Sequence, residues 1–353
     1  MTLHFTGRRT EGVSETIRAS IIGASGYSGA ELLKILLRHP SVSVDRLFAG
    51  ASVGRRVVEL YPSIIGAAEM TYHAYAPELA SDSDILFLAL PPGEAMILAP
   101  GLLASGKRVI DLSGDFRLPD TTVYSRYYER EHTAPALLGE AVYGLSELYR
   151  ATIRGARLVA NPGCYPTSVI PALAPLLAAG LVEREGIVIN SLSGLSGAGR
   201  KGSVELSFCE VNESVRAYRV GTHQHIPEIA RILCEAAGAD VGFSFIPHLI
   251  PLSRGIHTTI SAPLKAGVDG RQIDEAFDSA YRSEPFIRAA AGHTPEIRGV
   301  AGTNLVDIGY HIDDANGRVT VLSAIDNLIK GAAGQAVQNM NILFELEETE
   351  GLR

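Results

Sequence analysis

The chain has 353 residues, 46% of them hydrophobic and 20% charged, and its formal net charge is -8 at pH 7. This length allows two domains with separate cores, and the acidic balance, without a basic stripe, excludes nucleic acid as an expected partner. Three cysteines are too few for a disulfide framework, and no Cys or His spacing resembles a zinc site. We therefore expect a protein of the reducing cytoplasm that holds no metal.

The first 17 residues precede the first predicted strand. They include charged side chains at positions 8, 9, 11 and 15 and have no apolar core. This composition is typical neither of a signal peptide nor of a membrane anchor. We expect residues 1–17 to form a mobile tail and expect no membrane partner.

A predicted strand over residues 18–23 runs into a glycine-rich turn and then into a helix over residues 30–38. The glycines follow the spacing G-x-x-G-x-x-G, in which missing side chains let a pyrophosphate approach the backbone at a helix N-terminus. A plain turn between a strand and a helix is the alternative, but the flanking elements favour a dinucleotide site. The predicted cofactor-binding residues of this turn are Gly23, Ser25, Gly26, Tyr27, Ser28 and Gly29.

The loop after the second predicted strand, residues 42–49, bears on the choice of cofactor. NAD-specific sites place an Asp or Glu there to bind the ribose 2'-hydroxyl. This loop carries Ser52, Arg55 and Arg56 instead. Because cations suit a 2'-phosphate, the sequence favours NADP, with Ser52 and Arg55 among its contacts. Solvated surface arginines would give the same pattern.

Two further strands, residues 85–90 and 108–113, are apolar enough to be buried in a parallel sheet. Strands that alternate with helices predict a doubly wound, Rossmann-type α/β sheet, which binds ligands at the carboxyl ends of its strands. Arg117 follows the second of these strands and is a candidate anion binder. A surface arginine paired with Asp115 or Asp120 is an equally good interpretation of this passage.

A lone thiol, Cys164, follows a predicted strand over residues 156–160 and the turn-forming pair Pro162-Gly163. The apolar residues 167–179 predict a helix directly after it. A thiol near the positive end of a helix dipole has a lowered pKa, which makes Cys164 a candidate nucleophile. A buried structural cysteine is the alternative, yet a core thiol needs no such turn.

The second half is rich in strands, which we expect at residues 187–192, 243–249, 255–264, 304–312 and 318–325. Two sizeable helices interrupt them, at residues 227–237 and 270–283. This order predicts an α+β domain with a largely open mixed sheet and helices on one face. A second glycine-rich loop, residues 193–199, follows the first of these strands and could approach a ligand or be a flexible turn.

Two imidazoles, His223 and His225, precede the helix that begins near Pro227. Histidines at this spacing form a poor metal site without nearby carboxylates or thiols, so proton transfer is the sharper hypothesis, and surface polar groups are the alternative. The final segment, residues 326–341, predicts a long helix with Asp326 as its N-cap. Its small residues, 331–334, allow close packing against a sheet or a cofactor.

Four segments, residues 161–167, 223–229, 247–255 and 326–333, together resemble the N-acetyl-gamma-glutamyl-phosphate reductases of the aspartate-semialdehyde dehydrogenase superfamily. The similarity extends over residues 18–344. Ser168 stands where this family usually has Gly or Ala, and Gln224 and Ile226 replace its usual Arg and Thr.

The resemblance implies NADPH-dependent reduction of N-acetyl-L-glutamyl 5-phosphate to the semialdehyde through a Cys164 thioester, in arginine biosynthesis. It favours His223 of the pair for acid–base work, and it implies that Glu228 orients a histidine or binds the acetamido group. Arg117 would bind the phosphate or the α-carboxylate. The residues implied for the nicotinamide half are Ser196, Gly197 and Asn327. His248 and Arg254 also match family positions, but the sequence does not distinguish a catalytic role from a structural one for either residue. Cys209 and Cys234 are interpreted as structural.

We expect an NADP-binding domain over residues 18–160, completed by the C-terminal helix at 326–345, and a catalytic and dimerisation domain over 161–325. The open sheet needs covering, so a homodimer or homotetramer is expected. Three alternatives stay open: a lysine-pathway reductase of carrier-bound aminoadipyl phosphate, aspartate-semialdehyde dehydrogenase itself, and a non-catalytic NADP-sensing protein. The carrier would need a basic surface, for which a charge of -8 gives little indication.

Overall fold

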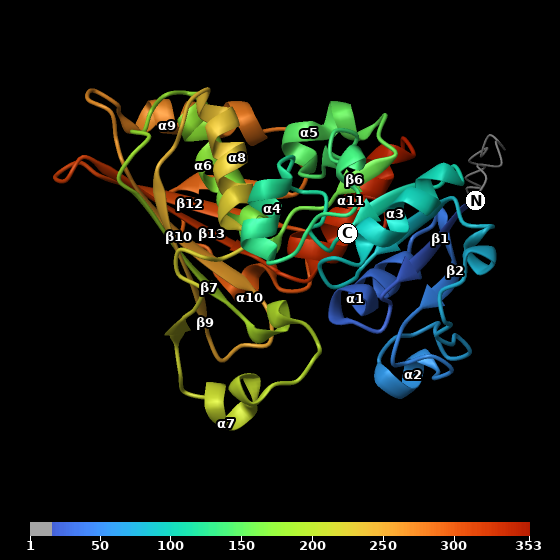
Figure 1. Ribbon diagram of the computed structural model, residues 1–353. Helices are drawn as coiled ribbons and strands as arrows, with labels where there is room; N and C mark the ends of the chain where they lie inside the picture. Colours follow the sequence, from blue (N-terminus) through green and yellow to red (C-terminus); the bar gives the residue numbers. More distant parts are fainter. Residues whose placement is uncertain (1–15) are drawn as a thin grey trace, which may run out of the picture.

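The computed structural model describes residues 16–353 (Figure 1). Residues 1–15 of the tail expected over residues 1–17 lie outside the described residues. Ile17 is the first residue of the first strand, and its side chain is buried in the core beside that sheet.

The first half of the chain forms a six-stranded parallel sheet of order β2-β1-β3-β4-β6-β5. Its strands are β1 (Ile17–Ile22), β2 (Val42–Phe48), β3 (Ile85–Leu88), β4 (Arg108–Asp111), β5 (Val142–Tyr143) and β6 (Leu158–Ala160). Its helices are α1 (Tyr27–Leu36), α2 (Val57–Leu60), η1 (Pro77–Ala80), α3 (Ala95–Ala104), α4 (Thr121–Tyr128), η2 (Pro135–Leu137) and α5 (Ser146–Ile153). Separate cores form on the α1 side and the α3 side of the sheet. The Rossmann-type prediction is confirmed.

The second half forms a seven-stranded mixed sheet of order β11-β12-β13-β10-β7-β9-β8. Its strands are β7 (Ile187–Ser193), β8 (Arg216–Ala217), β9 (Phe243–Leu249), β10 (Ile256–Pro263), β11 (Ile287–Ala291), β12 (Val306–Asp313) and β13 (Arg318–Ile325). Its helices are α6 (Cys164–Ala178), η3 (Leu195–Ala198), η4 (Val204–Leu206), α7 (Phe208–Val211), α8 (Ile226–Ala237), α9 (Gly270–Tyr281) and α10 (Ile297–Val300). The predicted open mixed sheet is confirmed, although sequence analysis missed the short edge strands β8 and β11.

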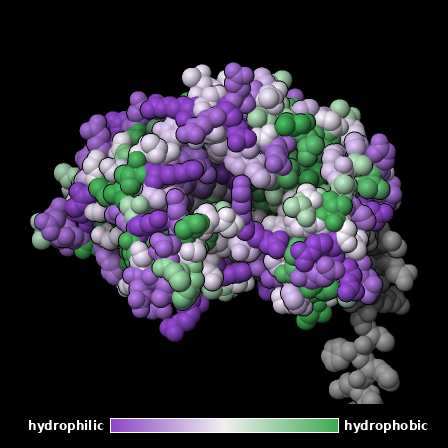
Figure 2. All heavy atoms as spheres, turned by 60° about the horizontal axis from the view of Figure 1, so that its bottom comes forward, coloured by the Kyte–Doolittle hydropathy of each residue, from purple (hydrophilic) through white to green (hydrophobic). Residues whose placement is uncertain are grey.

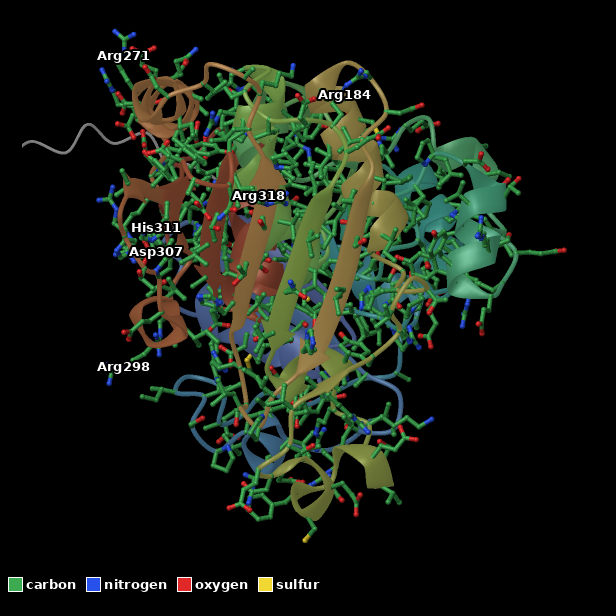
Figure 3. The ribbon with its side chains drawn as sticks, turned by 90° about the vertical axis from the view of Figure 1, so that its left-hand side faces the viewer. Arg184, Arg271, Arg298, Asp307, His311 and Arg318 are labelled. Carbon is green, nitrogen blue, oxygen red and sulfur yellow. The ribbon has the colours of Figure 1, made fainter. Side chains whose placement is uncertain are left out.

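One face of this second sheet is covered by α6, α8 and α9, which share a core with alternate strand residues (Figure 1). Along β7 and β10 buried and half-buried residues alternate strictly. Figure 3 looks onto the opposite face, where Arg318 and His311 are labelled. Within residues 16–353 no helix covers that face, so it is available to a partner.

The C-terminal segment corrects the prediction of one regular helix over residues 326–341. The carboxylate of Asp326 does accept bonds from the amides of Leu328 and Ile329, as an N-cap would. A π-helix, η5 (Ile329–Ala333), follows, because Gly331 N–H bonds to the carbonyl of Asp326, five residues back. Only then does α11 (Gly334–Leu343) begin, and it packs into the α1-side core of the first sheet.

Candidate active site

The turn that carries Cys164 is held by the strand before it, the helix after it and two side-chain hydrogen bonds of Asn161. β6 ends at Ala160, Gly163 is the N-cap and Cys164 is the first residue of α6. The helix thus begins three residues earlier than the predicted 167–179. The Asn161 amide donates to the carbonyl of Ala332 at 3.1 Å, and its Oδ1 accepts from Asn339 Nδ2 at 3.0 Å. Because these partners lie near the C-terminus, the turn in the middle of the chain depends on contacts with the C-terminal segment.

The structure corrects the expected pKa of Cys164. Its thiol lies among densely packed neighbours, and this burial raises the pKa to about 11. The positive charge of Arg117 and the backbone amides of residues 164 and 165 act in the opposite direction but do not offset it. The position of Cys164 at a helix N-terminus is therefore not enough to lower its pKa and form a thiolate. In the free protein near neutral pH, Cys164 is a neutral thiol that needs a proton acceptor.

The raised pKa predicts how Cys164 reacts with iodoacetamide. Only the thiolate is alkylated, so the rate should rise about tenfold per pH unit from pH 7 to pH 10. The measurement uses a Cys209→Ala/Cys234→Ala variant, in which Cys164 is the sole thiol. A rate that levels off below pH 8 would show that the helix dipole dominates after all.

Tight packing over Cys164 comes from the π-helix η5. A Cβ added to Gly331 would lie 2.9 Å from the Cβ of Cys164, so only glycine fits here. The widened π turn brings this glycine onto the cysteine, and π turns are frequent at functional sites. The small residues 331–334 were expected to pack against a sheet or a cofactor, whereas Gly331 packs on Cys164 at the start of α6.

Arg117 is buried rather than on the surface, and its partner is neither Asp115 nor Asp120. Its Nε donates to the carbonyl of Asn161 at 2.7 Å, and its NH1 lies 3.5 Å from Glu228 Oε2. The guanidinium therefore lies directly behind the cysteine turn. A partner 111 residues away in the sequence left no local pattern to indicate it.

Glu228, on the first turn of α8, is almost fully buried. Its Oε1 accepts from the amide of Gly163 at 2.8 Å and from the hydroxyl of Tyr143 at 2.7 Å. The carboxylate thus holds the residue that precedes Cys164. No bond from Glu228 to a histidine is present among the described residues, so the expected orienting contact is not formed. Sequence analysis missed Tyr143, which has no recognisable motif.

Both imidazoles of the pair lie beside the cysteine turn. A Cβ added to Gly163 would lie 2.4 Å from His225 Nε2, so the His225 ring packs on this glycine. The Nδ1 of His223 accepts from the amide of His225 at 3.1 Å. Burial lowers the pKa of His223 to about 3 and that of His225 well below its usual value, so both rings are neutral near pH 7.

Two tyrosines, also missed in the sequence, complete this side of the site. Tyr218 OH lies 3.4 Å from His223 Nε2 and 3.0 Å from Tyr165 OH. Tyr165 directly follows Cys164 in the first turn of α6. The chain of hydroxyls thus connects the His223 ring with the surroundings of Cys164.

The glycine-rich turn after β1 has the geometry of a phosphate-binding loop. Gly23 has φ +90°, and a Cβ there would lie 2.1 Å from the carbonyl of Ala89. Gly26 is the N-cap of α1, and no side chain caps the first turn of this helix. Its first amides are therefore open to an anion. The residues present fit the diphosphate of a dinucleotide.

The loop after β2 gives a less direct picture of the ribose site. Ser52 is buried, and Arg55 and Arg56 are exposed and both lie close to Glu59, with N–O distances of 3.3 and 3.6 Å. Both arginines thus already have a carboxylate partner, Glu59, on the protein surface. The spacing of three and four residues before Glu59 was visible in the sequence and could have indicated these pairs.

One residue predicted for each half of the cofactor lines a cavity of about 570 Å³ between the two halves of the molecule. Tyr27 of α1 and Ser196 of the second glycine-rich loop both line it. The Asn327 amide donates to Ser196 Oγ at 3.0 Å, and its oxygen accepts from the amide of Gly255. Gly197 lies beside Asn327. Figure 2 shows the surface hollowed between the two halves.

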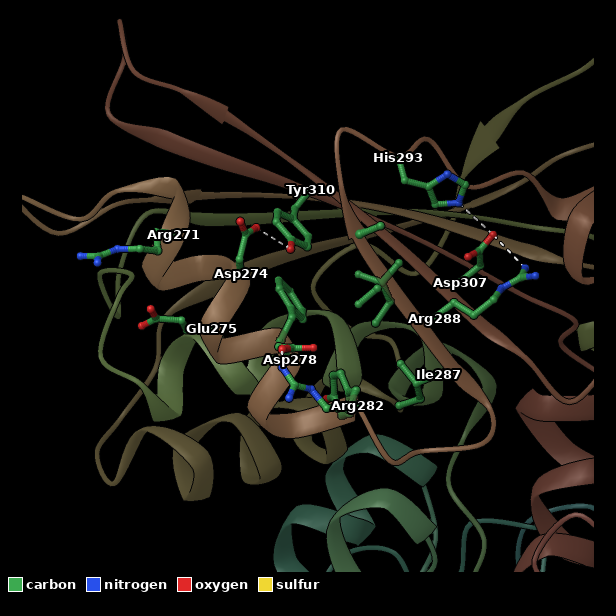
Figure 4. Close-up of a pocket in the computed structure, with 15 residues that line it drawn as sticks. Arg271, Asp274, Glu275, Asp278, Arg282, Ile287, Arg288, His293, Asp307 and Tyr310 are labelled. Carbon is green, nitrogen blue, oxygen red and sulfur yellow. Dashed lines mark hydrogen bonds and ion pairs between the residues drawn. The ribbon is translucent and has the colours of Figure 1, made fainter.

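A larger cavity of about 770 Å³ lies between α9 and β11 and is lined by none of the predicted site residues (Figure 4). Several of its charged side chains are paired with one another, as in the Asp307 contacts with Arg288 and His293, both 3.1 Å. Within residues 16–353, no group of His, Cys, Asp and Glu side chains is arranged to hold a metal ion. No helix over the same residues is long and apolar enough to cross a membrane.

Cys209 is exposed, which corrects its interpretation as structural, whereas Cys234 is half-buried.

Comparisons with known proteins agree with this architecture. Residues 18–156 match the semialdehyde dehydrogenase NAD binding domain, and residues 164–327 match the semialdehyde dehydrogenase dimerisation domain. The fold is similar to that of aspartate semialdehyde dehydrogenase II complexed with ASA from Vibrio cholerae, with a TM-score of 0.70, 17% identity and coverage of 94% of this chain and 98% of that chain. The Candida albicans aspartate semialdehyde dehydrogenase with NADP gives a TM-score of 0.66 at 14% identity, over 93% of this chain and 98% of that one. The two family models cover most of the chain, which therefore belongs to the semialdehyde dehydrogenases.

Sequence relatives narrow this class. The N-acetyl-gamma-glutamyl-phosphate reductase of Symbiobacterium thermophilum is 49% identical over 96% of this chain and 97% of its own length. That of Pelotomaculum thermopropionicum is 50% identical over 95% and 97%. The chain belongs to the N-acetyl-gamma-glutamyl-phosphate reductase family, which confirms the family predicted from its motifs.

Proposed function

We propose that this enzyme reduces N-acetyl-L-glutamyl 5-phosphate to N-acetyl-L-glutamate 5-semialdehyde and phosphate, with NADPH as the reductant, in arginine biosynthesis. The observation that carries this proposal is the position of Cys164. It lies at the start of α6 among Arg117 and two neutral imidazoles, at the junction of a dinucleotide-type sheet and the second sheet. Family membership supplies the substrate class.

In the first step, the Cys164 sulfur attacks the acyl carbon and its proton passes to the imidazole pair. The S–C bond forms, the C–O bond to phosphate breaks, and the phosphate leaves. Arg117 offers a fixed guanidinium to the phosphate or to the α-carboxylate. Glu228 holds the Gly163 amide, so the turn stays in place as the sulfur reacts.

When bound, the nicotinamide supplies hydride to the thioester carbon. The resulting thiohemiacetal collapses, the C–S bond breaks and the aldehyde is released. The departing sulfur regains its proton from the imidazole pair, for which we favour His223. The amides at the N-terminus of α1, together with Ser25, Tyr27 and Ser28, would hold the diphosphate, and Ser196, Gly197 and Asn327 would face the nicotinamide.

NADP is favoured over NAD because the loop after β2 carries Ser52 and Arg55 and no carboxylate at its start. The ion pairs with Glu59 are exposed, and exposed pairs of this kind are worth less than about 1 kcal/mol. A 2'-phosphate could therefore take Arg55 from its present partner at little cost.

The domain boundary near residue 160 is part of the same proposal. Supporting it, the two sheets meet between Ala160 and Cys164, and α11 packs into the α1-side core of the first sheet. A homodimer or homotetramer formed through the open face of the second sheet is supported by the half-buried residues along β7 and β10. A cytoplasmic location fits the three unpaired cysteines.

The reverse reaction tests the proposal. We expect phosphate-dependent reduction of NADP by N-acetyl-glutamate semialdehyde, with a weaker rate for NAD and little for aspartate semialdehyde. Faster turnover of aspartate semialdehyde, or of a carrier-linked aminoadipate semialdehyde, would assign one of the alternative substrates. Binding of NADP without turnover of any of these aldehydes would instead fit a non-catalytic sensor.

A further inference from the structure

A single side chain, Arg254, connects the helix of the dinucleotide site with the segment over Cys164. It lies between β9 and β10, and its NH2 donates to Glu31 Oε1 of α1 at 2.8 Å. Its NH1 donates to Asp326 Oδ2 at 3.1 Å. Both carboxylates are buried, with 8% of Glu31 and 0% of Asp326 exposed, whereas Arg254 itself borders the cavity that Tyr27 and Ser196 line.

The Asp326 end of this connection leads to the cysteine. Its second carboxylate oxygen accepts from the amides of Leu328 and Ile329 at 2.9 and 3.2 Å. Its carbonyl accepts from the amide of Gly331 at 3.0 Å, which sets the width of the π turn. Gly331 is the residue that packs directly on the Cβ of Cys164.

The Arg254 backbone is fixed as well. A Cβ on Gly194 would lie 2.8 Å from the Arg254 amide nitrogen, so the second glycine-rich loop packs against this residue. The amides of Leu195 and Ser196 donate to the carbonyls of Leu252 and Ser253 at 2.8 and 3.0 Å. Arg254 therefore contacts α1, the helix that follows the first glycine-rich turn, through its side chain, and it supports the second glycine-rich loop through its backbone.

We propose that Arg254 is a positioning residue that holds the cofactor helix and Cys164 at a fixed separation for hydride transfer. This inference rests on the proposed function. Acylation of Cys164 needs only the groups around the turn, so it should not depend on the bridge. Hydride transfer needs donor and acceptor atoms within about 3–3.5 Å, and a displacement of 1 Å costs up to about 100-fold in rate.

The chain offers a matched control. Lys34 Nζ donates to the same Glu31 oxygen, also at 2.8 Å, but has no contact with Asp326. Lys34→Gln thus removes one positive charge from Glu31 and leaves the bridge in place. Arg254→Gln removes the same charge and breaks the bridge.

The experiment compares phosphate released with NADPH oxidised when N-acetyl-glutamyl phosphate is supplied. Spontaneous hydrolysis is subtracted with a Cys164→Ala blank. In wild type and Lys34→Gln the ratio should be one. In Arg254→Gln we expect NADPH oxidation to slow at least about tenfold. Phosphate release should then exceed it, as a burst of acyl-enzyme or through hydrolysis of the thioester by water to N-acetyl-glutamate and free thiol.

A ratio of one in Arg254→Gln, or an equal rise in Lys34→Gln, would overturn the proposal. If Arg254→Gln does not fold, Arg254→Lys serves instead, because one ammonium does not span both carboxylates as the guanidinium does, and its ratio should also exceed one. A wild-type enzyme without Cys164-dependent phosphate release would instead refute the proposed function.

Discussion

Cys164→Ala is expected to abolish catalysis and leave the fold and cofactor binding intact. Phosphate-dependent reduction of NADP by the semialdehyde should fall by at least about 10⁴-fold, because no other group on the turn can form the thioester. Alanine keeps the Cβ against which Gly331 packs, so the contact between η5 and α6 survives. The rate is measured by absorbance at saturating aldehyde, and NADP affinity by isothermal titration calorimetry.

The matched control for this variant is Cys209→Ala. Cys209 lies exposed on α7 and contributes no contact to the cysteine turn. It should keep the wild-type rate. Activity in Cys164→Ala within tenfold of wild type would mean that hydride transfer proceeds without a covalent intermediate, and the mechanism would have to be rejected.

Elements with continuous local patterns were predicted well from the sequence. The bounds of β9 and β13 agree with the prediction to the residue. The glycine-rich turn before α1 could be recognised because its spacing, its strand and its helix lie within 20 residues. These features depend on neighbours in the chain, so a single sequence contains the information that determines them.

Properties set by distant neighbours were not accessible in the same way. The pKa of Cys164 was predicted from its helix and was wrong, because the burial comes partly from Gly331, which lies 167 positions further along the chain. The burial of Arg117 and its contact with Glu228 likewise depend on the packing of α8 against the turn. Roles such as those of Tyr143 and Tyr218 follow from the fold and from no motif.

The π-helix shows why a correct local pattern can still give the wrong element. Asp326 and the small residues after it favour a helix with an N-cap, and both features are present in the structure. The turn is widened because the carbonyl of Ala332 accepts a hydrogen bond from the side-chain amide of Asn161 and because Gly331 packs on Cys164. Only the three-dimensional contacts determine that the first turn is π rather than α.

His223→Asn is expected to have the larger effect of the two histidine replacements. The backbone amide of His225 donates to Nδ1, so Nε2, which faces Tyr218 OH, is the ring atom left to exchange a proton with the site. Asparagine keeps an acceptor for that amide and removes Nε2. Since positioned acid–base groups contribute about 10²–10⁴-fold, kcat should fall by that range with NADP affinity unchanged.

His225→Asn tests the assignment from the other side. The His225 ring packs on Gly163, and its Nε2 lies 3.5 Å from Arg117 NH1, so its replacement should loosen the turn and reduce kcat less. Because burial lowers the pKa of His223 to about 3, the ring stays neutral from pH 5 to pH 8, and kcat in wild type should show no inflection near 6.5. A larger loss in His225→Asn than in His223→Asn would transfer the proton-transfer role to His225, since its buried Nδ1 has no hydrogen-bond partner in the described part of the chain.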